Sequence, residues 1–153
     1  MKIGVDSSIL VAGVHANHPL HAVAAGWLIK NIPLHELIVS HHSILETYAV
    51  LTRLPGELRL TGLEAKQLLE STIKLNMRVA DFSSSSIWDY VDSLVDQSAL
   101  GGRSYDVFIA EILSKSGAES IATFNTRHFS EFATRMSIID PSKPGGDNSD
   151  TEN

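Results

Sequence analysis

The fold is decided by residues 3–10, which read Ile3-Gly4-Val5-Asp6-Ser7-Ser8-Ile9-Leu10. Residues 1–5 form an apolar run of strand length that stops at an acid and two serines, and residues 9–14 fit the first turns of a helix. A buried strand that ends at a carboxylate indicates a site, since ligands of α/β proteins bind outside the carboxyl ends of the strands.

Strands and helices alternate along the rest of the chain. The patterns predict strands at residues 1–5, 37–39, 77–82, 121–124 and 136–139, and helices at residues 18–30, 41–54, 61–75, 83–100, 103–116 and 128–135. Thr61 and Glu64 have the spacing of a capping box, and Gly117 fits a helix C-cap. This alternation predicts an α/β/α three-layer sandwich with a mostly parallel central sheet.

Length and composition favour one compact domain. The chain has 153 residues, and we expect residues 1–140 to form the domain and residues 141–153, which lack aliphatic side chains, to be a disordered tail. The absence of cysteine excludes disulfides and thiolate metal sites. No apolar run approaches the roughly 20 residues of a membrane span, so a cytoplasmic protein is expected.

The net charge of −6 argues against a protein that grips nucleic acid by bulk electrostatics. This net charge is compatible with a local cluster of basic residues. Because a negatively charged protein repels phosphate groups, chemistry on them would need a bound cation.

Three acids are candidates for a site. Asp6 follows the first strand, with Asn125 at the matching place after the fourth, although an Asp there is equally suited to capping the next helix. Asp106 lies within about 60° of Ile109, Ala110 and Leu113 on a helical wheel, so a carboxylate there needs a partner, a metal ion or a proton unless its first-turn position gives it solvent.

Glu46 gives a weaker signal. It lies away from the expected apolar stripe of Ile44, Tyr48 and Leu51, which by itself indicates a solvated surface acid. Only folding can bring Glu46 together with Asp6 and Asp106. If the three acids meet, a site with several oxygen ligands and no soft ligand suits Mg²⁺ or Mn²⁺.

Four stretches in order resemble the four motifs of PIN-domain ribonucleases, and the chain looks most like a VapC-type toxin of a toxin–antitoxin system. The resemblance covers about residues 1–140. The stretches are Ile3 to Leu10 as quoted, Ser43-Ile44-Leu45-Glu46, Tyr105-Asp106-Val107-Phe108-Ile109-Ala110 and Thr123-Phe124-Asn125-Thr126-Arg127-His128-Phe129.

The resemblance implies a Mg²⁺- or Mn²⁺-dependent endoribonuclease. Asp6, Glu46 and Asp106 would hold the metal, and RNA would be cut to leave a 5′-phosphate and a 3′-hydroxyl. A cognate antitoxin and a homodimer are also implied by the resemblance alone. Asn125, counted with the catalytic residues, stands where many members carry a fourth Asp; its carboxamide offers an oxygen without a charge, which favours one ion over two.

Weaker candidates surround these acids. Ser7 matches the hydroxyl residue that commonly follows the first acid, and it is suited equally to bonding a carboxylate and to starting a helix. Arg103 and Arg127 lie close in sequence to Asp106 and Asn125, and either one is suited to a substrate phosphate or to a local salt bridge. His128 is expected to orient backbone.

Neither the histidines nor the tryptophans indicate a further site. His15, His18 and His21 invite a zinc site, but they straddle Pro19 and share no helical face. The aromatic residues Trp27, Trp88 and Tyr90 are assigned to the core or an interface, since none is interleaved with basic residues.

A catalytically weak PIN-like module that binds RNA or protein is the alternative to a nuclease, and Asn125 and the acidic surface permit it. A phosphatase that uses Asp6 as nucleophile has little support, because Ser8 stands where such enzymes need a second Asp. No Gly-rich loop of the nucleotide-hydrolysing kind is present.

Overall fold

The structure is a computed structural model that describes residues 1–80, 87–132 and 135–144. In the described residues five parallel strands form one sheet in the order β3-β2-β1-β4-β5. The strands are β1 (Lys2–Val5), β2 (Glu36–Ser40), β3 (Met77–Ala80), β4 (Ser120–Ala122) and β5 (Ser137–Ile139). The helices are α1 (Ser7–Val14), α2 (His21–Asn31), α3 (His41–Arg53), α4 (Gly62–Ile73), α5 (Ile87–Asp96), α6 (Arg103–Lys115) and α7 (Thr126–Phe129).

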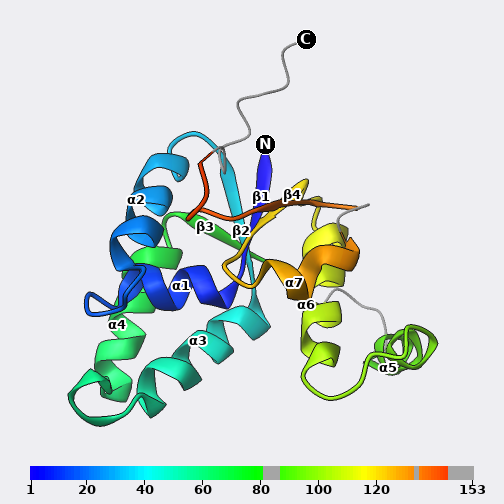
Figure 1. Cartoon of the computed structure of the whole chain (residues 1–153), viewed down its shortest axis with the longest axis horizontal. Coiled ribbons are helices and arrows are strands. Elements are labelled where there is room, and N and C mark those ends of the chain that lie inside the picture. Colours follow the sequence, from blue (N-terminus) through cyan, green and yellow to red (C-terminus); the bar gives the residue numbers. More distant parts are fainter. Residues whose placement is uncertain (81–86, 133–134, 145–153) are drawn as a thin grey trace.

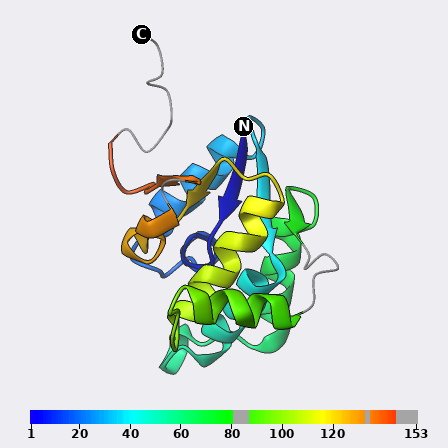
Figure 2. The same ribbon diagram turned by 90° about the vertical axis from the view of Figure 1, so that its right-hand side faces the viewer.

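Helices cover both faces of the sheet, as the alternating pattern predicted. Helices α1, α2 and α4 lie on one side and α5, α6 and α7 on the other (Figure 1). Figure 2 looks onto the second face, where α6 crosses the strands. Side chains alternate accordingly: Leu37 and Val39 of β2 pack in the core under α1, α2 and α4, whereas Ile38 packs with α6. The three-layer α/β/α prediction is confirmed.

The strand order reverses at β1, and this reversal creates the site. The chain adds β2 and β3 on one side of β1, then β4 and β5 on the other. Connections therefore leave β1 and β4 toward opposite faces, which opens a crevice at their carboxyl ends. The N–H of Asp6 donates a 3.0 Å hydrogen bond to the carbonyl of Ala122, so the ends of these strands are tied together.

The predicted capping box is present: Thr61 accepts from the N–H of Glu64, and the Glu64 carboxylate accepts from the N–H of Thr61. Gly117 adopts φ +84° after α6, the left-handed conformation that favours glycine at a C-cap.

Two local predictions were wrong. Instead of a helix over residues 128–135, α7 ends at Phe129 and a 3-10 turn (Ser130–Phe132) follows, because Phe129 and Phe132 both enter the core and three-residue spacing puts them on one side of such a turn. Residues 133–134 lie outside the described residues, as do 81–82 of the predicted third strand, 83–86 of the next helix and 145–153 of the predicted tail.

The second wrong prediction concerns the inner face of α3. Its buried residues are Ser43, Thr47 and Leu51, while Tyr48 is 41% exposed. Small hydroxyl residues can be buried here because their hydrogen bonds are made locally: Thr47 Oγ1 donates to the Ser43 carbonyl, and Ser43 Oγ lies 2.9 Å from Ser40 Oγ. A search for apolar residues at helical spacing therefore does not detect the buried face of α3.

None of the helices that the structure describes has the length and hydrophobicity needed to span a lipid bilayer.

Candidate active site

Three carboxylates from three different elements line one pocket at the carboxyl edge of the sheet. The pocket has a volume of about 460 Å³. Asp6 comes from the end of β1, Glu46 from α3 and Asp106 from the first turn of α6. The full lining is Asp6, Ser7, Glu46, Gly102, Arg103, Tyr105, Asp106, Asn125, Arg127 and His128.

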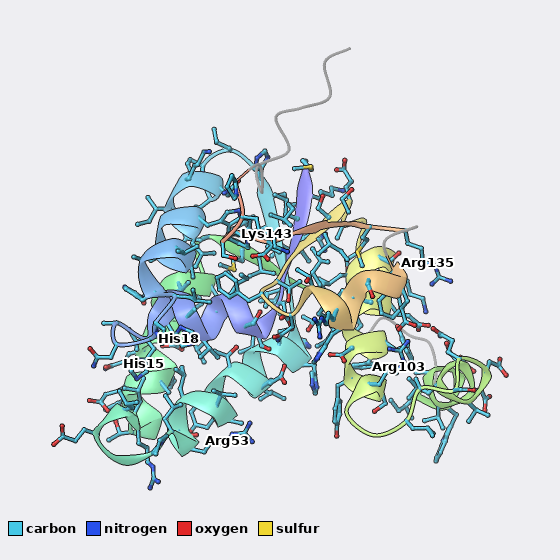
Figure 3. The ribbon with its side chains drawn as sticks, viewed as in Figure 1. His15, His18, Arg53, Arg103, Arg135 and Lys143 are labelled. Atoms are coloured by element: carbon cyan, nitrogen blue, oxygen red, sulfur yellow. The ribbon has the colours of Figure 1, made fainter. Side chains whose placement is uncertain are left out.

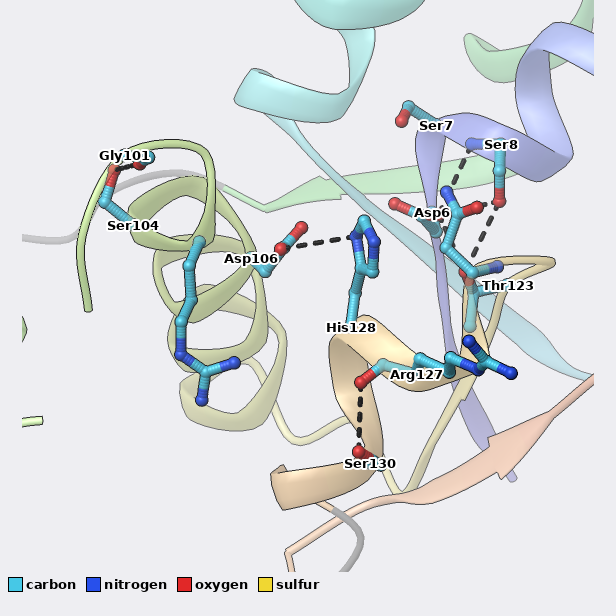
Figure 4. Close-up of polar contacts among 12 residues, drawn as sticks. Asp6, Ser7, Ser8, Gly101, Ser104, Asp106, Thr123, Arg127, His128 and Ser130 are labelled. Atoms are coloured by element: carbon cyan, nitrogen blue, oxygen red, sulfur yellow. Dashed lines mark hydrogen bonds and ion pairs between the residues drawn. The ribbon is translucent and has the colours of Figure 1, made fainter. Parts of the chain in front are cut away.

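Asp6 is fixed through one of its two oxygens. The side chain is only 3% exposed, and its Oδ2 accepts hydrogen bonds from Ser8 Oγ at 2.7 Å and Thr123 Oγ1 at 2.8 Å (Figure 4). The Ser8 N–H approaches the same oxygen at 3.4 Å, so Asp6 is also the N-cap of α1. Capping the helix and lining the pocket, which the sequence left as alternatives, are therefore compatible roles of one carboxylate.

Glu46 is held by Ser7. The Ser7 hydroxyl donates a 2.7 Å hydrogen bond to Glu46 Oε2, across 39 positions of sequence. Ser7 is the first residue of α1 and is buried, so it both starts the helix and orients an acid of the pocket. The partner of Glu46 explains why an acid that looked solvated on its own helix is turned toward the site.

Asp106 is paired with His128. The His128 Nδ1 lies 3.4 Å from Asp106 Oδ2, and Figure 4 shows the imidazole of α7 facing the carboxylate of α6. Burial raises the pKa of Asp106 above its ordinary value; His128 opposes this shift, and the negative charges of Asp6 and Glu46 add to it. The three acids therefore repel one another across the pocket, and a cation there would relieve the repulsion.

Each carboxylate keeps one oxygen without a protein hydrogen bond in the described part of the chain. Oδ1 of Asp6, Oε1 of Glu46 and Oδ1 of Asp106 accept no such bond, while the second oxygen of each acid is held by Ser, Thr or His. Free oxygens of this kind fit a hard divalent cation. As the side chains lie, however, no three His, Asp or Glu residues of the described ranges are arranged to hold a metal ion.

The remaining predicted residues lie around the same pocket. Asn125 is exposed at the start of α7, and its N–H donates to Thr123 Oγ1. Arg103 forms an ion pair with Glu131, as a local salt bridge would. Arg127 lines this pocket and also a second one of about 480 Å³, whose lining includes Ile138, Asp140 and Lys143.

Sequence reasoning does not find the residues that hold the acids in place. Ser8 and Thr123 hold Asp6, and the ring of His128 contacts Asp106, which corrects the expectation that His128 orients backbone. A usable signal existed for Thr123, because it is a polar residue directly after a buried strand, as Asp6 is.

The histidines that suggested zinc have other partners. His15 Nε2 lies 2.8 Å from the Leu58 carbonyl, and His21 Nδ1 lies 2.9 Å from that of Ala12. Figure 3 places His15 and His18 at the α1–α2 end of the molecule, well away from Arg103 at the candidate site.

Of the aromatic residues assigned to core or interface, Trp27 and Tyr90 are buried and Trp88 is 70% exposed.

Comparison with known proteins agrees with this geometry. The family model described as PIN domain matches residues 3–134. The chain belongs to the PIN domain family. Similar curated PIN relatives are ribonuclease VapC27 of Mycobacterium tuberculosis, 29% identical over 82% of this chain and 85% of the relative, and ribonuclease VapC40 of the same species, 30% identical over 76% and 82%.

Solved structures share the PIN fold. M. tuberculosis VapC20, described as a toxin that cleaves the sarcin-ricin loop, has 19% identity and a TM-score of 0.66 over 84% of this chain and 94% of its own. VapBC2 of Rickettsia felis, bound to a DNA fragment from its promoter, has 16% identity and a TM-score of 0.64 over 90% and 97%. FitAcB of Neisseria gonorrhoeae has 16% identity and a TM-score of 0.59 over 93% and 99%.

Proposed function

We propose that this PIN domain is an endoribonuclease that hydrolyses RNA with Mg²⁺ or Mn²⁺ held by Asp6, Glu46 and Asp106, and that it is the toxin of a toxin–antitoxin pair. The observation that carries the proposal is that these three acids, 40 and 60 residues apart, line one pocket at the carboxyl edge of the sheet. The names of the relatives, which are ribonucleases, support the reaction.

The donor set fits a divalent cation, because it consists of oxygens on three mutually repelling acids. In the structure, the three acids of the described chain are not close enough together to hold an ion. Their side chains would have to move toward one another when an ion binds. Such an ion supplies an activated water molecule and neutralises charge that builds up on the phosphoryl oxygens.

The chain's own residues prepare the pocket. Ser8 and Thr123 each donate a hydrogen bond to the same oxygen of Asp6. The carboxylate therefore cannot rotate freely, and its other oxygen keeps a fixed direction. Ser7 does the same for Glu46. Arg127, which lines the pocket, is suited to contact a phosphate of the substrate. Arg103 could do so only after its ion pair with Glu131 is broken. Asn125 offers a neutral amide where a charge would favour a second ion.

An antitoxin that occludes this pocket, a homodimer and a cytoplasmic location complete the proposal. The antitoxin rests on the resemblance to VapC-type toxins and is supported by neighbours such as VapBC2 and FitAcB. The homodimer rests on the resemblance alone, and the cytoplasmic location rests on the expectation from the sequence. Size-exclusion chromatography with light scattering of the purified chain tests the dimer.

The test of activity is cleavage of a total RNA pool in Mg²⁺, Mn²⁺ or EDTA, with sequencing of the 5′ ends. We expect discrete cuts that require metal and leave 5′-phosphates. Asp6→Asn should reduce the cutting rate by about a hundred-fold or more, since removing a group that stabilises transition-state charge takes away several kcal/mol. Asp92→Asn, at an exposed position of α5 outside the pocket, is the matched control and should cut like the wild type.

Absence of cuts from folded, metal-replete protein free of any inhibitory partner would overturn the nuclease. It would favour the alternative, a catalytically weak module that binds RNA or protein. Cuts that persist in EDTA would overturn the metal dependence alone.

A further inference from the structure

An exposed aromatic ring stands at the rim of the acidic pocket. Tyr105 is the residue before Asp106 in the first turn of α6; it lines the pocket and is 56% exposed. Its ring is stacked on His42 of α3, with ring centroids 4.8 Å apart and planes 13° from parallel. One face of Tyr105 is thus covered by an imidazole, while more than half of the residue stays exposed beside the pocket.

The stack is anchored in the protein. His42 meets Phe108 edge to face at 6.2 Å, and Phe108 meets the buried Tyr90 in the same manner at 5.1 Å. Tyr105 is therefore held at the outer end of a chain of rings that leads into the α5–α6 interface. A ring held in place before binding loses little conformational entropy when a ligand packs on it.

The pocket needs a source of affinity for RNA other than charge. The whole chain has a net charge of −6, and three of the residues lining the pocket are acids. Of the two arginines that line the pocket, Arg103 is paired with Glu131, which leaves Arg127 for a phosphate. Stacking of a base on an aromatic face does not depend on net charge, and it selects unpaired bases.

We propose that Tyr105, backed by His42, is the platform on which the protein stacks the base of a nucleotide next to the scissile phosphate. This rests on the proposed nuclease function and deepens it, because it assigns a base-binding side chain beside the three acids. His42 acts as a positioning residue, because it supports the ring of Tyr105 from behind. Position 105 then contributes to where the enzyme cuts.

The first arm of the test measures binding without cleavage. Short single-stranded RNA carrying 2-aminopurine at one position at a time is mixed with protein in EDTA, where stacking on a ring quenches the fluorescence. Wild type and Tyr105→Phe should quench the probe at one position, and Tyr105→Leu should not. Tyr48→Leu, which removes an exposed tyrosine of α3 outside the pocket, is the control and should quench like the wild type.

The second arm measures cleavage in Mg²⁺ of RNA that is intact or abasic at the position so identified. We expect Tyr105→Leu to raise KM about ten-fold on intact RNA, the range of one base–aromatic stack, and to leave the abasic RNA unaffected. A structural role of Tyr105 would change both substrates alike.

Quenching by Tyr105→Leu equal to that of the wild type, no quenching by any of the folded proteins, or an equal loss on intact and abasic RNA would each overturn the platform. If wild type cuts no RNA, the proposed nuclease fails, and the quenching arm still decides whether Tyr105 binds a base.

Discussion

Thr123 at the end of β4 donates a 2.8 Å hydrogen bond to the Oδ2 of Asp6 at the end of β1, across 117 positions of sequence. Both residues are buried, and their strands are neighbours in the sheet. The bond joins the two strand ends at which the strand order reverses. It makes the position of the first acid a consequence of strand pairing.

Thr123→Val should therefore weaken both stability and activity. It deletes a buried hydrogen bond to a carboxylate, which is worth roughly 1.5–3 kcal/mol, and loss of such a supporting contact lowers activity by about 10- to 100-fold. Thr123→Ser, which keeps the hydroxyl, should retain most of both. Urea denaturation and RNA cleavage rates measure the two effects; a valine variant as active as the serine variant would show that the bond does not support catalysis.

Asp106→Asn should stabilise the protein at neutral pH. Because the pKa of Asp106 is raised in the folded state, folding favours its protonated form, and the ionised form destabilises the fold as the pH rises through that pKa. The uncharged amide escapes this penalty. The advantage of the variant should shrink as the pH falls and vanish below about 3.9, the ordinary pKa of Asp.

Denaturation curves of wild type and Asp106→Asn at several pH values measure this difference. A variant that is less stable than the wild type at pH 7 would mean that attraction to His128 outweighs burial and the repulsion from Asp6 and Glu46.

Mn²⁺ should stabilise the wild type more than the Asp6→Asn variant. An ion that binds only the folded protein adds about 1.4 kcal/mol to the free energy of unfolding when its concentration is ten times its Kd. Thermal unfolding in Mn²⁺ and in EDTA gives the shift in Tm, with Asp92→Asn as the control that should respond like the wild type. Equal shifts in all three proteins would place the ion elsewhere.

Gly4→Val should destabilise the sheet. A Cβ at position 4 would lie 2.6 Å from Cδ1 of Leu113, which is fully buried where α6 packs on β1. We expect a loss of about 1–3 kcal/mol, the usual range for overpacking a core. Gly26→Ala in α2 is the contrasting control: a Cβ there meets nothing within 4 Å, so a gain of about 0.5–1 kcal/mol is expected.

The fold and part of the site were predictable because they depend on local patterns. The alternation of strands and helices, the capping box of Thr61 and Glu64, and an acid at the end of the first strand are all readable within a few residues. They suffice for the three-layer architecture and for the edge of the sheet at which a site forms.

The contacts that shape the pocket were not predictable, because each joins elements far apart in sequence. Glu46 looks solvated until α1 places Ser7 beside it, and Tyr105 looks like an ordinary surface residue until α3 places His42 beneath it. The inner face of α3 was misassigned because its buried serine and threonine satisfy their own hydrogen bonds.

The most direct measurement is the initial rate at which wild type and Asp106→Asn cleave one mapped RNA site in Mg²⁺, with the Tm of both proteins recorded in the same buffer. We predict that the variant loses activity by about a hundred-fold or more while its Tm stays equal or rises, since Asp106 would serve the reaction at the expense of stability. A folded Asp106→Asn protein that cuts at the wild-type rate would contradict an active site built on these three acids.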